Sequence, residues 1–376
     1  MHSKPTLAIF GSSLVSAYWN GAATYYRGVL RALHECGVDI VFYEPDAYQR
    51  QQHRDMADPE WARVVVYPAT DDGVQRALQD ASDADIVVKA SGVGVFDAYL
   101  EAEIPLLASA STMTIFWDVD APATLERMRN DARDPFRVQV GRYDLVLTYG
   151  GGPPVVEEYE QLGARECVPI YNALDPATHY PVPRDERFAG AMAFLGNRLP
   201  DREARVQAFF LEPARRLGNR SFVLGGSGWG DGIELPSNVR YVGHVYTRDH
   251  NAFNCTPRIV ININRDSMAR TGYSPPTRIF EAAGAAACLV CDTWEGIEAF
   301  LEPGREVLCV GSGKEVIEVL ERTTPEAARA IGDAARSRIL AEHTYAHRAA
   351  LLYRLLRDRR PPSTFWKRVG VHAAPT

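Results

Sequence analysis

The sequence predicts an α/β protein with two Rossmann-like domains, each built on a doubly wound parallel sheet. Short apolar, β-branched strands alternate with helical stretches along both halves of the 376 residues. This alternation is typical of parallel sheets covered by helices. A proline-bearing stretch near the middle separates the two halves, and a chain of this length can bury two hydrophobic cores.

The first half begins with a strand expected at residues 6–10, followed by a loop and a helix over residues 22–36. Gly21, just before this helix, either caps it or turns the loop towards bound phosphates, since glycine serves both purposes at a helix start. Three glycines at residues 150–152 precede another helix, and they form either a flexible turn or a loop whose backbone amides face the cleft. Further strands of this half are expected at residues 40–43, 64–67, 86–89, 106–108, 145–148 and 167–170.

Composition and charge exclude several classes of protein. The formal net charge of −7 gives no broad basic face for nucleic acid. The cysteines are scattered, and the CxxC pair Cys288 and Cys291 lies in an apolar strand, so reduced core thiols are expected there instead of a zinc or redox site. Neither an export signal nor a membrane-spanning run is recognisable, so a cytoplasmic protein is expected.

The most informative stretch covers residues 259–292 and predicts a strand, a polar loop, a helix and a second strand. The helix is expected to start near Thr277 and carries Arg278 and Glu281, three residues apart and therefore on one face. In open α/β sheets, ligands bind beyond the carboxyl ends of strands, where helix N-termini present N–H groups to anions. A diphosphate here would meet Arg265 and Arg278, and Glu281 could accept hydrogen bonds from ribose hydroxyls.

This stretch resembles the signature region of group 1 glycosyltransferases with the GT-B fold, and most of all the family of the spore maturation protein CgeB. In that group a Glu is followed, after seven residues, by a second Glu that binds the donor ribose. Glu281, in FEAAGAA, matches the second Glu. The first position is Tyr273, which lacks the contact to the donor sugar seen in retaining members, so the stereochemical outcome stays open.

The resemblance extends over nearly the whole chain and implies two domains that face a cleft, with a C-terminal helix that crosses back to the N-terminal domain. It divides the chain into an acceptor domain (1–172), a hinge linker (173–190), a donor domain (191–342), the returning helix (343–360) and a tail (361–376).

The resemblance also implies a donor site. Arg198 follows the strand expected at residues 192–195 and corresponds to the basic residue placed against the diphosphate; Arg202 either joins it or lies at the surface. The glycine loop at residues 225–232 leads into no helix, which excludes a dinucleotide fingerprint and favours a place beside the base. The expected donor-binding residues are Gly21, Gly196, Asn197, Arg198, Gly226, His244, Val245, Arg265, Gly272, Tyr273, Ser274, Thr277, Arg278 and Glu281.

Catalysis is expected to depend on Arg198 and Arg278, with Asp118 or Asp120 as the base that deprotonates the acceptor. Both aspartates lie in IFWDVDAP, which looks like the corresponding element of CgeB-like proteins. They also spell the DxD that holds a metal in GT-A enzymes, but a single DxD is common by chance. As another alternative, Asp120 caps the helix that starts near Pro122.

The resulting expectation is a hexosyltransferase that moves a sugar from a nucleotide-diphosphate sugar to a hydroxyl or amine, with no metal and no cofactor. The acceptor can be a glycan, a protein or a small molecule, and no nucleic acid is involved. A nucleotide-sugar 2-epimerase and a catalytically idle GT-B module in a coat or assembly are the alternatives. The donor base, the sugar and the oligomeric state are not determined by the sequence.

Overall fold

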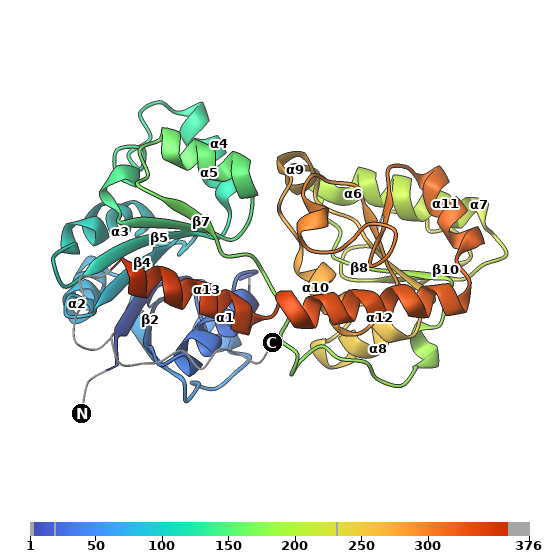
Figure 1. Ribbon diagram of the computed structural model, residues 1–376, viewed down its shortest axis with the longest axis horizontal. Coiled ribbons are helices and arrows are strands. Elements are labelled where there is room, and N and C mark those ends of the chain that lie inside the picture. Colours follow the sequence, from blue (N-terminus) through green and yellow to red (C-terminus); the bar gives the residue numbers. More distant parts are fainter. Residues whose placement is uncertain (1–3, 19, 231, 360–376) are drawn as a thin grey trace. The chain divides into compact units, whose positions relative to one another are not determined.

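The computed structural model describes residues 4–18, 20–230 and 232–359, and the chain divides into two compact units (Figure 1). The first unit is built from the chain up to residue 148, residues 158–170 and the chain from residue 345 onwards. The second unit consists of residues 149–157 and 171–344. The expected tail at residues 361–376 lies outside the described residues.

The first unit contains a parallel sheet in which the described residues form seven strands, in the order β3-β2-β1-β4-β5-β6-β7. The strands are β1 (Thr6–Phe10), β2 (Asp39–Asp46), β3 (Ala62–Pro68), β4 (Ile86–Ala90), β5 (Met113–Asp118), β6 (Leu145–Thr148) and β7 (Cys167–Pro169). The helices are α1 (Ala23–Glu35), α2 (Asp71–Ala81), α3 (Asp97–Glu103), α4 (Ala121–Asn130), α13 (Tyr345–Asp358) and the end of α5 (Gly152–Gln161). The strand order reverses at β1, which pairs with both β2 and β4.

One strand of the first half was predicted in the wrong place. Residues 106–108 were expected to be a strand, but Ile104–Leu107 forms a 3-10 turn and the strand is Met113–Asp118. Pro105 has no N–H for a strand ladder, and Leu106 is 63% exposed. Every residue of Met113–Asp118 is buried, as a central strand requires.

The C-terminal helix α13 belongs to the first unit, as the predicted fold requires, and packs against α1. A Cβ atom on Gly28 would lie 2.2 Å from the ring of Tyr345, so only glycine allows this close approach. Tyr25, one turn before Gly28, receives a hydrogen bond from Trp117 Nε1 (3.1 Å) and donates one to the carbonyl of Ile170 (2.6 Å).

The second unit has a parallel sheet of six strands among the described residues, in the order β10-β9-β8-β11-β12-β13. The strands are β8 (Met192–Leu195), β9 (Phe222–Gly225), β10 (Val239–Gly243), β11 (Ile259–Asn262), β12 (Leu289–Asp292) and β13 (Leu308–Val310). The helices are α6 (Pro200–Val206), α7 (Glu212–Arg216), α8 (His250–Cys255), α9 (Asp266–Thr271), α10 (Thr277–Gly284), α11 (Gly313–Arg322) and α12 (Pro325–Glu342). The order reverses at β8, which pairs with both β9 and β11.

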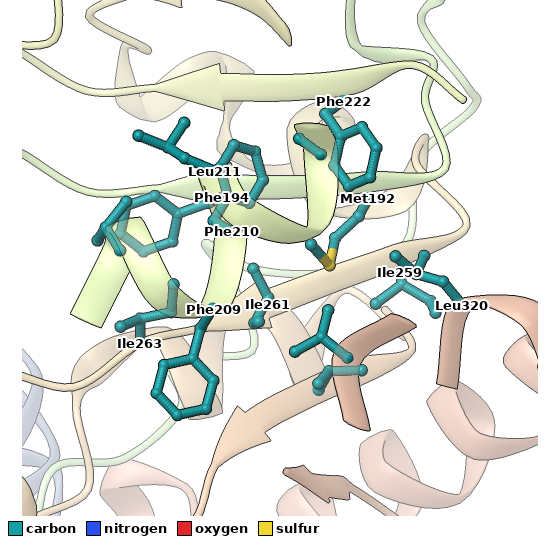
Figure 2. Packing of buried hydrophobic residues seen from close by; sticks show 14 of the residues in the cluster. Met192, Phe194, Phe209, Phe210, Leu211, Phe222, Ile259, Ile261, Ile263 and Leu320 are labelled. Carbon is teal, nitrogen blue, oxygen red and sulfur yellow. The ribbon is translucent and has the colours of Figure 1, made fainter. Parts of the chain in front are cut away.

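Hydrophobic clusters cover both faces of this second sheet because successive side chains of each strand point to opposite sides. Ile259 and Ile261 join Met192 and Phe194 in the cluster of Figure 2, whereas Val260 belongs to the opposite cluster under α10 and α12. The alternation explains why these short strands read as unbroken apolar runs in the sequence.

The helix expected over residues 202–217 is interrupted. A π-helical turn, Gln207–Leu211, separates α6 from α7. Pro213 cannot donate to the carbonyl four residues earlier and its ring crowds that carbonyl, and a π-turn is one way in which a helix accommodates such a residue.

The stretch expected as a linker, residues 173–190, belongs to the second unit and contains only one 3-10 turn, Glu186–Phe188, and the bridge between Leu174 and Thr344. Its role as a hinge stays a prediction. Among the described residues, no helix is both long and apolar enough to cross a membrane.

Candidate functional site

The loops that follow β8 and β9 interlock through their backbones. Gly196 N–H donates to the carbonyl of Gly225 (3.0 Å), Arg198 N–H to that of Ser227 (2.9 Å), and Ser227 N–H to the side-chain oxygen of Asn197 (2.9 Å). Gly226 has φ +116, and a Cβ atom there would lie 2.3 Å from the carbonyl oxygen of Gly196. These predicted site residues therefore form one rigid edge at the point where the strand order of the sheet reverses, which is where open α/β sheets bind ligands.

Arg198 holds a carboxylate in this structure. Its Nε and Nη2 donate to the two oxygens of Glu203 at 2.8 and 2.9 Å, in a bidentate pair. The hydrogen bonds from Arg198 lower the pKa of Glu203. The side chain of Arg198 is only partly buried, so a diphosphate could take the place that Glu203 occupies.

Arg202 is half-buried, so it lies between the two alternatives, joining the site or lying at the surface. Its Nε is buried with no hydrogen-bond partner in the described part of the chain, and its guanidinium lies 5.6 Å from the ring centre of Phe194. Burial, together with the charges of Arg265 and Arg278, lowers the pKa of Arg202 to about 10. The charges of two further guanidiniums thus act on Arg202, and such an accumulation of positive charge favours an anion.

Arg265 lies in the loop after β11, directly before α9, and pairs with Asp201 at 3.1 Å. Asp201 also accepts from the hydroxyl of Ser267 at 2.7 Å, and hydrogen bonds to its carboxylate keep its pKa below the ordinary value although partial burial raises it. This segment contains the short helix α9, which the sequence did not predict.

The following turn, which contains Gly272, Tyr273 and Ser274, is strained and tightly held. Tyr273 has φ +43, and its N–H donates to the carbonyl of Glu295 at 2.6 Å. Its carbonyl accepts from Gly151 N–H at 2.8 Å, so the predicted glycine triplet is engaged here and is not a free turn. Backbone strain of this kind persists only where the surroundings enforce it, and it is common at ligand sites.

Helix α10 starts directly after this turn, with Pro276 as N-cap residue and no side-chain cap. The hydroxyl of Thr277 accepts a hydrogen bond from Asn172 at 2.6 Å. Arg278 Nη1 lies 3.1 Å from Glu281 Oε2, and both side chains are mostly buried. The predicted pair therefore shares one helix face, next to a helix end whose N–H groups have no side-chain cap.

Two histidines that sequence reasoning missed complete the surroundings of Glu281. His179 Nε2 lies 3.8 Å from Glu281 Oε1, and His250 lies on α8 with its ring 6.0 Å from that of His179. Burial raises the pKa of Glu281, but the charge of Arg278, followed by the effect of the two neighbouring imidazoles, outweighs burial and lowers the pKa overall. Neither histidine carries a sequence signal, since they are far apart in the chain and stand in no motif.

Two further residues expected in the donor site, His244 and Val245, differ in exposure. His244 is exposed, with its ring 4.7 Å from that of Tyr246 in an edge-on contact. Val245 is 5% exposed and packs with Phe253 in a hydrophobic cluster. The side chain of Val245 is apolar, so only its backbone can make polar contacts. The backbone carbonyl already accepts a hydrogen bond from His250.

The first unit contains a cavity of about 420 Å³ beyond β1, β4 and β5, again at the reversal of strand order. Gly21, Asp120 and Arg50 line it. Asp120 is the N-cap residue of α4, the position that one alternative gave it, although its side chain makes no cap hydrogen bond. Asp118 is fully buried and accepts hydrogen bonds from Tyr159 (2.5 Å) and from the backbone of Asp120 (3.0 Å).

Comparison with known proteins is consistent with this geometry. A family model described as "Glycosyl transferase-like" matches residues 202–354, which include Arg265, Arg278 and Glu281. No curated protein matches the chain by sequence.

Solved structures resemble nearly the whole chain. Sucrose-phosphate synthase from Thermosynechococcus elongatus matches 94% of this chain and 99% of its own, with TM-score 0.66 and 11% identity. The Anabaena protein HepE in complex with UDP and glucose matches 94% and 100%, with TM-score 0.66 and 13% identity. AviGT4, a glycosyltransferase involved in avilamycin A biosynthesis, matches 94% and 97%, with TM-score 0.58 and 14% identity. With its two parallel sheets and its returning C-terminal helix, the chain therefore has the GT-B fold of two Rossmann-like domains.

Proposed function

We propose that the protein is a glycosyltransferase that moves a sugar from a nucleotide-diphosphate sugar to an acceptor hydroxyl or amine. The observation that supports this most is the mostly buried pair Arg278 and Glu281 on the first turns of α10, within the region matched by the glycosyl transferase-like family model. At this helix start, the guanidinium suits the diphosphate of the leaving group and the carboxylate suits its ribose. That HepE was solved with UDP supports a nucleoside diphosphate as the leaving group.

The proposed chemistry depends on stabilising negative charge. Breaking the bond at the anomeric carbon leaves charge on the diphosphate. Four guanidiniums would face this charge together with the N–H groups at the start of α10, those of Arg198, Arg202, Arg265 and Arg278. Such preorganised charges commonly contribute most to lowering a barrier, and one contact is worth roughly 2.7–4 kcal/mol in comparable oxyanion sites. With four guanidiniums in these roles, we propose that transfer needs no metal.

The acceptor would bind in the cavity of the first unit. Asp120 lines this cavity and is therefore our candidate for the base that removes the acceptor proton, whereas Asp118 is fully buried and holds Tyr159. Gly21 and Arg50 line the same cavity. We further propose that the enzyme is of the CgeB-like type, transfers a hexose and works in the cytoplasm.

Thermal unfolding in the presence of UDP, GDP, dTDP and their sugars tests the donor site. One nucleotide is expected to raise the unfolding midpoint, because a ligand that binds only the folded protein stabilises it. Arg278→Ala and Glu281→Gln are expected to lose this shift. Arg270→Ala is the matched control, since Arg270 is an exposed arginine of α9 paired with Asp266. If no nucleotide shifts the wild-type midpoint, the proposed donor site is wrong.

Incubation of the stabilising donor sugar with and without candidate acceptors then separates transfer from its rivals. Transfer gives a new glycoside only when an acceptor is present. A 2-epimerase would change the donor sugar without one, and an idle module would leave it unchanged.

A further inference from the structure

A cluster of two histidines and one carboxylate lies beside the proposed diphosphate site. One ring nitrogen of His179, one of His250 and one carboxylate oxygen of Glu281 lie within 4.8 Å of one another. His179 is 6% exposed and the Glu281 side chain 13% exposed. Such a buried group of metal-ligand atoms differs from the exposed acidic clusters that are common on protein surfaces.

The hydrogen bonds of His250 leave one nitrogen bare. Its Nε2 lies 3.2 Å from the carbonyl oxygen of Val245, and because a carbonyl can only accept, Nε2 carries the proton. Nδ1 is buried and has no hydrogen-bond partner within the described residues. With the proton of the neutral ring on Nε2, the lone pair is on Nδ1.

One ring nitrogen of His179 also lacks a proton, although different hydrogen bonds fix the tautomer of this ring. The hydroxyl of Thr178 donates to the carbonyl of Asp175 (3.0 Å), so towards His179 Nδ1, at 2.9 Å, it can only accept. Nδ1 therefore carries the proton. Nε2 is bare, buried and without a hydrogen-bond partner in the part of the chain that is described, and it lies 3.8 Å from Glu281 Oε1.

Glu281 divides its two oxygens between two neighbours. Oε2 faces Arg278 at 3.1 Å, and Oε1 faces His179. The positive charge of Arg278 opposes the binding of a metal ion nearby. Arg278 faces Oε2, however, so Oε1 can bind an ion together with the histidines. Histidine ligands of zinc typically donate their other ring N–H to a protein oxygen, which fixes the tautomer and the ring orientation. Both rings here already make such a bond.

We propose that His179, His250 and Glu281 bind a zinc ion, with a fourth position left for water. Two imidazoles and one carboxylate are a ligand set that zinc takes in open, three-ligand sites. Zinc bonds of about 2.0–2.2 Å require ligand atoms closer together than they are here, so binding draws the three side chains inwards. The bare, buried nitrogens are what such an ion would satisfy.

The consequence for activity rests on the proposed function. A zinc ion on Glu281 takes the carboxylate that would accept the ribose hydroxyls, so zinc and the nucleotide exclude one another. The ion is therefore an inhibitor of transfer and not its cofactor.

Zinc titration of the full-length, tag-free, chelator-treated protein tests the site, with calorimetry for Zn²⁺ and visible absorption for Co²⁺ as a spectroscopic substitute. The wild type is expected to bind one ion. His179→Ala and His250→Ala are expected to bind at least about 100-fold more weakly, the upper end of what losing an outer-shell partner alone costs. His244→Ala, which removes an exposed imidazole of the neighbouring segment, is the control and keeps wild-type zinc affinity.

The outcomes separate the site from the function. The proposal is overturned if the wild type binds no zinc, or if His179→Ala and His250→Ala both bind zinc as tightly as the wild type. Unfolding of each variant, measured without metal, shows whether that variant is folded. Competition is measured with UDP, GDP and dTDP, after correcting for zinc bound by the free nucleotide. If zinc binds but no nucleotide does, the metal site stands and the proposed donor site fails. If a nucleotide binds equally well with and without bound zinc, mutual exclusion is refuted.

Discussion

Arg205 on α6 and Asp292 at the end of β12 form an ion pair of 2.6 Å in which Asp292 is fully buried. The same carboxylate accepts hydrogen bonds from the backbone N–H of Asn264, at 3.1 and 3.0 Å. One buried group thus holds the first residues of the loop that leads to Arg265 and α10. Its position under the proposed donor site makes it a structural support rather than a ligand.

Asp292→Ala is expected to destabilise the protein by about 3–5 kcal/mol, because the change leaves Arg205 and the Asn264 N–H without their buried partner. Denaturant-induced unfolding measures this free energy. Asp72→Ala, which removes the partner of the exposed Arg76 in the first unit, is the control and is expected to cost no more than about 1 kcal/mol. Equal effects of the two substitutions would contradict the support assigned to Asp292.

Glu203 and a diphosphate are expected to compete for Arg198. Glu203→Gln weakens the bidentate pair and should tighten nucleotide binding by about twofold to fivefold, a modest gain because exposed ion pairs contribute little. Arg198→Ala should weaken binding. Calorimetry with the nucleotide that stabilises the protein measures both, and a Glu203→Gln variant that binds more weakly would show that the pair helps to form the site.

Gly226→Ala is expected to disrupt the junction of the loops after β8 and β9, since the new Cβ would collide with the carbonyl of Gly196 and the residue has φ +116. We expect a loss of about 2 kcal/mol or more in stability and a loss of nucleotide binding. Gly21→Ala is the control for stability, because a Cβ there meets nothing within 4 Å. Thermal unfolding of the two variants checks this; unchanged unfolding of Gly226→Ala would refute it.

The buried thiols are expected to be unreactive in the folded protein. Burial raises the pKa of Cys167 and of Cys288 to about 12, and it raises that of Cys291 as well, so little thiolate exists at pH 8. Titration with Ellman's reagent should give slow reaction of these thiols in buffer and rapid reaction of all six cysteines in denaturant. Rapid reaction of Cys288 and Cys291 in buffer would argue for an accessible CxxC.

The parts of the fold that the sequence predicted are those where burial is continuous. Strands β1, β6 and β8 lie where apolar runs indicated them, because nearly every side chain of these runs is inside a core. Residues 106–108 are apolar too, but Pro105 has no N–H for the hydrogen bonds of a sheet. Strand propensity alone does not take this into account.

The site was predictable only where it is local. Arg278 and Glu281 meet because of helical periodicity, which can be read from their spacing. His179 and His250 come together only through the tertiary fold, so no spacing could indicate them. Asp118 and Asp120 are two residues apart in the same motif. Which of them is buried depends on where β5 ends, and strand ends are the least predictable feature of a sequence.

The packing of Tyr345 into the hollow left by Gly28 ties the beginning of the chain to a segment that the ribosome makes more than three hundred residues later. During synthesis the first sheet can assemble early, but the outer side of α1 stays uncovered until the whole second unit has been made. The first unit therefore acquires α13 only after the second unit has been synthesised, and not when its own sheet is complete.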